Sequence, residues 1–123
     1  MRILNFRLPM LLCLLMGCGS ETIDEGKTVF GQPLPTQAAH FIVTLSPEVA
    51  GSAVGVNEYT LDLGLPSGMT VRNGRITVEP WMPDHGHGSD RAPEIIEMSD
   101  GKYHITRVVY TMPDLWQLRT QIE

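Results

Sequence analysis

The chain has 123 residues, 42% of them hydrophobic, and carries a formal net charge of −5 at pH 7. This length predicts a single domain, and an acidic chain without a basic stripe is a poor candidate for binding nucleic acid. Anionic lipid headgroups would also repel it, so attachment to a membrane would depend on a covalent lipid.

Residues 1–17 predict a secretory signal peptide. Arg2 and Arg7 supply positive charge, and the apolar run that follows them is shorter than the roughly 20 residues needed to span a bilayer. The run ends in Leu-Met-Gly-Cys at 15–18, which resembles the bacterial lipobox. That resemblance implies cleavage before Cys18, lipidation of Cys18 and a place in the cell envelope. An ordinary signal peptide with a chance cysteine is the alternative.

Processing at this point would change the chemistry of the mature chain. Cys13 would leave with the leader and Cys18 would carry lipid, so no thiol would remain as a metal ligand. Loss of Arg2 and Arg7 would bring the net charge to −7. Gly19 stands where, by the same resemblance, an Asp retains lipoproteins on an inner membrane. In a cell with two membranes this favours the outer one, with the domain facing the periplasm.

Residues 18–38 predict a lipidated N-terminus followed by a flexible tether. Small and polar residues dominate the segment, Pro33 and Pro35 come late in it, and no apolar periodicity is present. Three residues, 28–30, are too few to decide whether this part packs on the domain as an extra edge strand.

Residues 39–123 predict an all-β domain, because apolar and polar residues alternate with a period of two and turn signals recur every eight to twelve residues. This spacing favours an immunoglobulin-like antiparallel β-sandwich. We expect seven strands, at 41–45, 55–63, 69–71, 75–79, 93–98, 102–110 and 115–122, with a hairpin turn at Asn73-Gly74. The expected core comprises Phe41, Val43, Tyr59, Leu61, Ile76, Val78, Ile96, Ile105, Val109, Trp116 and Leu118.

The segment 79–89, Glu-Pro-Trp-Met-Pro-Asp-His-Gly-His-Gly-Ser, concentrates side chains that bind metals. Its prolines and glycines predict an irregular corner rather than a regular element. If the strands at 75–80, 93–98 and 102–110 alternate in direction, Met82 and Met112 lie at the same end of the sandwich. The Met-Pro-Asp sequence occurs at both places, 82–84 and 112–114. His40 starts the first strand and fits either end.

These two motifs, Trp-Met-Pro-Asp-His-Gly-His-Gly-Ser at 81–89 and Tyr-Thr-Met-Pro-Asp-Leu-Trp-Gln-Leu at 110–118, resemble those of YtkA-like and FixH-like envelope domains. The resemblance covers residues 39–123. It implies an immunoglobulin-like sandwich and an association with copper handling or cytochrome oxidase assembly, without a settled activity. The chain departs from the family at Asp114, where Gly is usual, and at His85, where Met is common.

The residue types at the corner predict a copper site. Thioether sulfur is soft and favours Cu(I), and imidazole binds either copper state. We expect Met82, His85 and His87 as ligands, completed by Met112 or Met98. Trp81 would cover the metal through a cation–π contact, and Asp84 or Asp90 would fix the tautomer of a ligating histidine. Zinc or Cu(II) held by the two histidines and one of these aspartates is also acceptable chemistry, although the methionines weigh against it.

Other interpretations remain open. The methionines would be core residues, more readily for Met98 than for Met112, and the histidines would be solvated in a glycine-rich turn. The domain would then be an interaction module without metal, docking its Trp-Met-Pro corner on an oxidase subunit or an efflux component. We expect no enzyme, since no cysteine nucleophile, nucleophile elbow or phosphate-binding glycine loop is present. Asp84, His85 and Ser89 are chain neighbours, which does not make an oriented triad.

Overall fold

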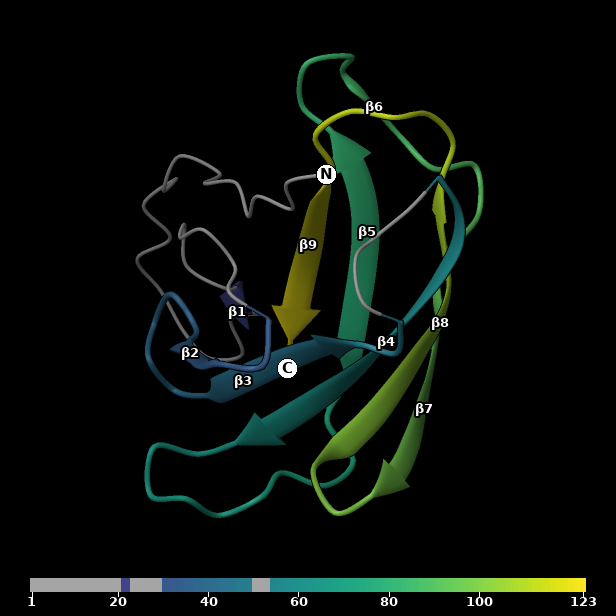
Figure 1. Ribbon diagram of the computed structural model, residues 1–123. Coiled ribbons are helices and arrows are strands. Elements are labelled where there is room, and N and C mark those ends of the chain that lie inside the picture. The colour runs from purple at the N-terminus through teal and green to yellow at the C-terminus, as the bar shows by residue number, and fades with distance from the viewer. Residues whose placement is uncertain (1–20, 23–29, 50–53) are drawn as a thin grey trace.

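The computed structural model describes residues 21–22, 30–49 and 54–123, which form two antiparallel β-sheets (Figure 1). None of these residues is helical, so the predicted all-β class is confirmed. Within the described ranges no helix is long and apolar enough to cross a membrane. The predicted signal peptide and the lipidation site Cys18 lie outside the described residues.

The two sheets enclose one core. The four-stranded sheet has the order β1 (Glu21–Thr22), β9 (Gln117–Ile122), β5 (Ile76–Met82) and β6 (His87–Gly88). The five-stranded sheet has the order β2 (Pro33–Pro35), β3 (Ile42–Pro47), β4 (Gly55–Gly64), β8 (Lys102–Tyr110) and β7 (Glu94–Ser99). Four aromatic side chains are the largest of the fully buried residues: Trp116, Tyr59, Tyr103 and Tyr110.

The folded domain begins earlier than predicted. Leu34 in β2 pairs with Val43, Phe30 stacks on Tyr59 with ring centroids 5.9 Å apart, and Thr36 is 2% exposed. A proline-rich segment can form this strand because β2 lies at the sheet edge, where an imino nitrogen needs no partner. The expectation of a flexible tether over 18–38 is therefore wrong for residues 30–36, and also for Glu21 and Thr22, which pair with β9.

The segment between β4 and β5 is a crossover between the sheets. The expected strand at 69–71 is only a single bridge between Gly64 and Thr70, and the expected hairpin at Asn73-Gly74 is wrong. The buried Tyr103 holds the crossover, because its hydroxyl donates to the carbonyl of Val71 at 2.8 Å and accepts the Gly74 N–H at 3.0 Å. The Asn73-Gly74 sequence, which usually indicates a hairpin, lies here where the chain crosses from one sheet to the other.

A β-bulge in β8 changes which of its side chains face the core. Tyr59 of β4 pairs with Ile105, but the next paired position, Asn57, lies opposite Val108. β8 therefore carries one extra residue there, and Arg107 has a positive φ of 60°. Beyond the bulge the buried side chains are Val108 and Tyr110, so the predicted core position Val109 is wrong.

Two other expected core residues also differ from the structure. Ile96 is 53% exposed, because Ile95 is the residue of β7 that packs toward the core. Phe41 is half-buried against the core rather than inside it. The remaining eight predicted core residues are buried as expected: Val43, Tyr59, Leu61, Ile76, Val78, Ile105, Trp116 and Leu118.

The strand directions define two ends of the sandwich. β5 and β8 run the same way and β7 and β9 run oppositely (Figure 1), so the ends of β5 and β8 lie together. We call residues 82–89 and 111–116 the histidine end. We call residues 64–75 and 99–102 the crossover end. His40 lies at the crossover end, because β3 begins beside it and Ile42 pairs with Gly64.

Candidate functional site

The turn at the histidine end is shorter than predicted. β5 continues through Pro80 and Trp81 to Met82, and the chain reverses over residues 83–86 before β6. The carbonyl of Met82 accepts the Gly86 N–H at 2.9 Å, and Gly86 has a φ of 68°. The Pro80 carbonyl accepts the Ser89 N–H on the β6 side of β5, and the Pro80 nitrogen points to the same side. Because the missing N–H therefore does not face β9, proline inside β5 leaves the β5–β9 hydrogen bonds intact.

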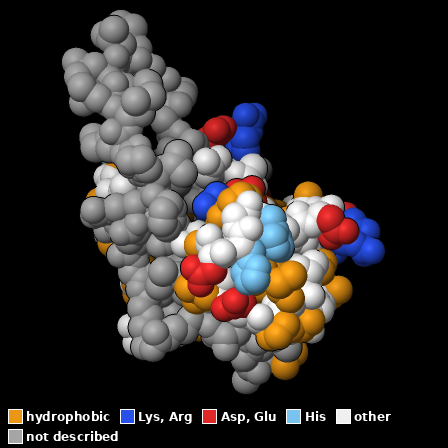
Figure 2. Space-filling model, turned by 90° about the horizontal axis from the view of Figure 1, so that it is seen from above, with side chains coloured by type: hydrophobic (Ala, Val, Ile, Leu, Met, Phe, Trp, Pro, Cys, Tyr) orange, Lys and Arg blue, Asp and Glu red, His pale blue; other side chains and the backbone are white. Residues whose placement is uncertain are grey.

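This turn brings the two histidines together. The imidazole centroids of His85 and His87 lie 5.8 Å apart. Two imidazoles that bind one metal through nitrogens at about 2.0 Å have centroids roughly 5 to 6.5 Å apart. The His85 side chain is 42% exposed and His87 is half-buried. Figure 2 looks down on this end and shows histidine side chains at the surface among acidic and hydrophobic ones.

Hydrogen bonds fix which ring nitrogens can bind a metal. His85 Nε2 lies 3.1 Å from Asp114 Oδ2, and His87 Nδ1 lies 3.0 Å from the carbonyl oxygen of Gly88. A carboxylate and a carbonyl can only accept, so in the neutral imidazoles these two nitrogens carry the protons. The lone pairs are then on Nδ1 of His85 and Nε2 of His87.

The loop after β8 supports this arrangement. Asp114 accepts the Leu115 N–H at 2.8 Å, and that bond, followed by the contact with His85, lowers the pKa of the Asp114 carboxyl. The indole Nε1 of Trp116 donates to the carbonyl of Met112 at 3.0 Å. The Trp116 ring lies 6.5 Å from that of His87. A core residue thus holds the loop that carries Asp114 beside the turn that carries His85.

The predicted sulfur ligands are in three different environments. Met112 is half-buried at the histidine end, as the strand directions predicted. Met82 reaches the same end but is fully buried in the core. Met98 is 64% exposed and forms a bulge in β7 beside the turn at the crossover end. The structure therefore does not bring Met98 to the histidines, and it is not a candidate ligand.

The predicted supporting residues also change. The carboxylate that contacts His85 is Asp114, whereas the sequence pointed to Asp84 or Asp90. The Trp81 ring packs under the guanidinium of Arg119, whose Cζ lies 4.3 Å from the ring centroid, so its cation is this arginine and not a metal. Trp116 is instead the indole whose ring makes an edge-on contact with His87. The repeated Met-Pro-Asp sequence was the signal that could have identified Asp114.

Nitrogen and oxygen ligands alone do not complete a site. Among the residues that the structure describes, no three His, Cys, Asp or Glu side chains are grouped so that they could hold a metal ion. The alternative set of His85, His87 and Asp84 or Asp90 is therefore not assembled. A metal at the two imidazoles would need a further ligand of another type, and of the two predicted methionines at this end Met112 is the one that is not fully buried.

Comparison with known proteins returned no match to a family model, to a curated protein or to a solved structure. The resemblance to YtkA-like and FixH-like domains stays a prediction from the two motifs.

Proposed function

We propose that the protein is a lipid-anchored protein of the cell envelope that binds copper at its histidine end, for copper handling or delivery. The ligands are Nδ1 of His85, Nε2 of His87 and the thioether of Met112. The observation that carries the proposal is the pair of accessible imidazoles, 5.8 Å apart, each held in one tautomer by an oxygen acceptor.

The chemistry of this donor set favours copper over other metals. Two neutral imidazoles and a neutral thioether suit Cu(I), and the soft sulfur disfavours zinc and magnesium. Asp114 takes the part of the carboxylate that orients a ligating histidine, an arrangement whose loss typically costs 10- to 100-fold in affinity. Met82 fills the core beneath the turn, so we assign it to packing rather than to ligation.

The place in the cell follows from the N-terminal sequence. The Leu-Met-Gly-Cys motif at 15–18 supports cleavage and lipidation at Cys18, and an envelope domain without thiols would use histidine and methionine to bind copper. The resemblance to YtkA-like and FixH-like domains points the same way. The outer membrane is favoured where the cell has two, with the domain facing the periplasm.

A competition experiment tests copper binding. The soluble domain is titrated with Cu(I), without oxygen, against a coloured chelator. We expect His85→Ala, His87→Ala and Met112→Leu each to weaken binding at least about 10-fold, since each removes one ligand. His40→Ala and Met98→Leu, at the crossover end, are matched controls that should bind like the parent. Binding no tighter than the chelator, or equal losses in the controls, would contradict the proposal.

A second candidate function is an interaction module that docks on an envelope partner, such as an oxidase or efflux component, without metal. Exposed valines favour it: Val49, Val54 and Val56 are 76%, 53% and 66% exposed. Val49 follows the end of β3, and Val54 and Val56 lie at the start of β4, where Gly55 pairs with Tyr110, so all three lie near the histidine end. Partner binding that persists in the double variant His85→Ala, His87→Ala and is lost in Val56→Ser would favour this function.

A further inference from the structure

We infer that the crossover end rests on the lipid surface, so that the histidine end points away from the membrane. The inference rests on the lipid anchor at Cys18 in the proposed function, and is independent of copper. It assigns an interaction surface to residues 64–75 and 99–102, and the partner is a layer of zwitterionic lipid headgroups.

The first argument is the length of chain between the anchor and the domain. Glu21 in β1 pairs with Ile122 in β9, and only Gly19 and Ser20 separate Glu21 from Cys18. An extended chain advances at most about 3.6 Å per residue, so the Cα of Cys18 lies within about 11 Å of that of Glu21. The domain is held close to the membrane and not at the end of a long tether.

The second argument is where this short connection leaves the fold. β1 is antiparallel to β9, so its first residue, Glu21, lies beside Ile122 near the C-terminal end of β9. Ile122 also pairs with Ile76, the first residue of β5. Met82 is six residues further along β5, or about 20 Å at 3.3 Å per residue. The anchor therefore attaches on the side of the crossover, and the histidine turn stands beyond the far end of β5.

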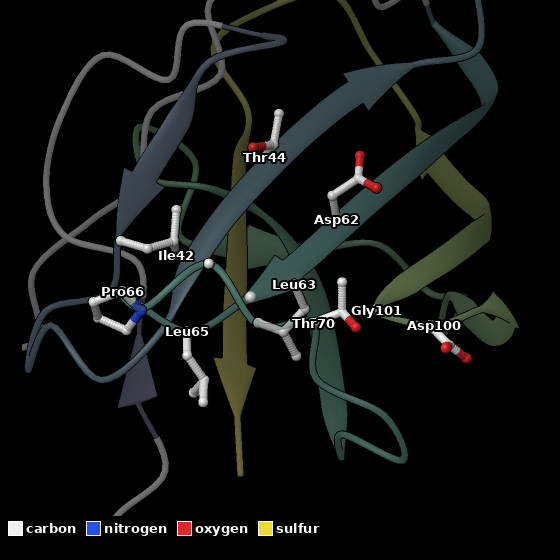
Figure 3. A pocket seen from close by; sticks show the side chains of 11 residues that line it. Ile42, Thr44, Asp62, Leu63, Leu65, Pro66, Thr70, Asp100 and Gly101 are labelled. Atoms are coloured by element: carbon white, nitrogen blue, oxygen red, sulfur yellow. The ribbon is translucent and has the colours of Figure 1, made fainter.

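The third argument is the surface that the crossover end presents. A groove of about 350 Å³ lies between the loop around Leu65 and Pro66 and the sheet face of Ile42 (Figure 3). The exposed part of this loop includes the apolar side chains of Pro66 and Met69, of which Met69 is 62% exposed. Exposed apolar side chains can enter the headgroup region of a bilayer.

Exposed apolar side chains occur at both ends, since Val54 and Val56 lie near the histidine end, but charge distinguishes the two ends. The carboxylates that line the groove are neutralised within the protein, Asp62 by Lys102 at 2.6 Å and Asp100 by Arg72. The histidine end carries the exposed Asp84, and the exposed Asp90 follows it directly; neither forms an ion pair with another residue that the structure describes. A charge-balanced surface suits zwitterionic headgroups, whereas exposed carboxylates would be kept in water. Both effects favour contact through the crossover end.

Fluorescence quenching tests this orientation. The lipidated full chain is reconstituted into vesicles of phosphatidylcholine and phosphatidylethanolamine, and a fluorophore is attached to Ser67→Cys or Asp84→Cys. The introduced cysteine is the sole thiol, since Cys13 leaves with the leader and Cys18 carries lipid. With a quencher on the lipid headgroups, we expect strong quenching at residue 67 and little at residue 84. Equal quenching, or stronger quenching at 84, would overturn the inference.

Flotation with the vesicles distinguishes the absence of a lipid anchor from a wrong orientation of the domain. A chain that does not float has no anchor, which overturns both the membrane part of the proposed function and the orientation. A chain that floats but shows equal quenching overturns the orientation alone. Glu21→Pro removes the N–H that faces Ile122 across the β1–β9 ladder, so it should reduce the difference between the two labels while flotation persists. Glu21→Ala keeps that N–H and should preserve the difference between the labels. Loss of the difference in both variants would remove β1 as the cause.

Discussion

The crossover end and the histidine end hold their charged and polar groups in different ways. At the crossover end, Arg72 with Asp100 and Lys102 with Asp62 satisfy one another. At the histidine end, Asp114 and the Gly88 carbonyl each take one ring nitrogen of a histidine, and the second nitrogen of each ring keeps its lone pair. The charged groups named at the crossover end are therefore paired within the protein, whereas the histidine end keeps two nitrogen lone pairs that can bind a ligand.

Each end is fixed by an aromatic core residue with a polar group. Tyr103 binds the crossover through its hydroxyl, and Trp116 binds the loop after β8 through its indole N–H. Buried aromatic residues of this kind combine a large packing contribution with one directed hydrogen bond. Substitutions in matched positions can therefore separate what stabilises the fold from what organises the histidines.

The largest expected effect is that of Trp116→Ala. The side chain is fully buried, and its truncation should lower the free energy of unfolding by about 3–5 kcal/mol. Trp116→Phe keeps most of the volume but loses the hydrogen bond to Met112, worth about 0.5–1.5 kcal/mol. We expect this folded variant to bind Cu(I) more weakly. Denaturant unfolding measures the stability and chelator competition measures the Cu(I) affinity. Unchanged copper affinity in Trp116→Phe would show that the hydrogen bond from Trp116 does not help to organise the histidines.

Tyr103→Phe is the corresponding change at the crossover end. It leaves the Val71 carbonyl and the Gly74 N–H without their partner, so the free energy of unfolding should fall by about 1–3 kcal/mol. Copper affinity should not change, because the histidine end is at the far end of β5. A loss of copper affinity comparable to that of Trp116→Phe would show that the two ends are not independent.

Two glycines give a matched pair with a smaller effect. Gly86 at the histidine end and Gly68 at the crossover end have φ angles of 68° and 93°, and an added Cβ would meet no atom within 4 Å at either. Alanine at each should therefore cost about 1–2 kcal/mol through backbone strain alone. We expect equal losses in thermal unfolding, but weaker copper binding only for Gly86→Ala. Equal copper affinities would mean that the turn geometry is unimportant.

The smallest expected effect on stability is that of Asp114→Asn. The Leu115 N–H and His85 lower the pKa of Asp114 in the folded state below its unfolded value of about 3.9. The stabilisation is therefore present above that value and disappears as the pH falls through the folded pKa. Thermal unfolding should show a small deficit at pH 7 that vanishes in acid.

Asp100→Asn is the control for this change, since Asp100 is an exposed carboxylate paired with Arg72 at the crossover end. Only Asp114→Asn should weaken copper binding, by about 10-fold or more, because His85 loses its charged acceptor. If the stability deficit of Asp114→Asn instead grew as the pH falls, this would contradict a lowered pKa of Asp114 in the folded state.

The sequence predicts the fold class and much of the core, because alternating apolar residues survive in every long strand. The misassigned position in β8 has a local cause. The bulge at Arg107 shifts the alternation by one residue, and nothing in the pattern from Lys102 to Tyr110 marks where the extra residue falls. Bulges depend on the partner strand, which a single sequence does not display.

The candidate site was likewise predicted in part. Strand directions correctly place Met82 and Met112 at one end. The burial of Met82 was predictable, since it continues the inward series of Ile76, Val78 and Pro80 in β5. The contact between His85 and Asp114 joins residues 29 positions apart, and only the folded loops determine it. Long-range side-chain pairing of this kind is the part that local pattern does not contain.

Nuclear magnetic resonance of the imidazole nitrogens tests the central claim most directly. Cu(I) is diamagnetic, so the domain with ¹⁵N-labelled histidine can be followed during titration with one equivalent of metal. We predict large shifts at Nδ1 of His85 and Nε2 of His87, with protons retained on Nε2 of His85 and Nδ1 of His87. His40 and His104 should be unaffected. Unchanged spectra of His85 and His87, or shifts centred on the other two histidines, would contradict the account.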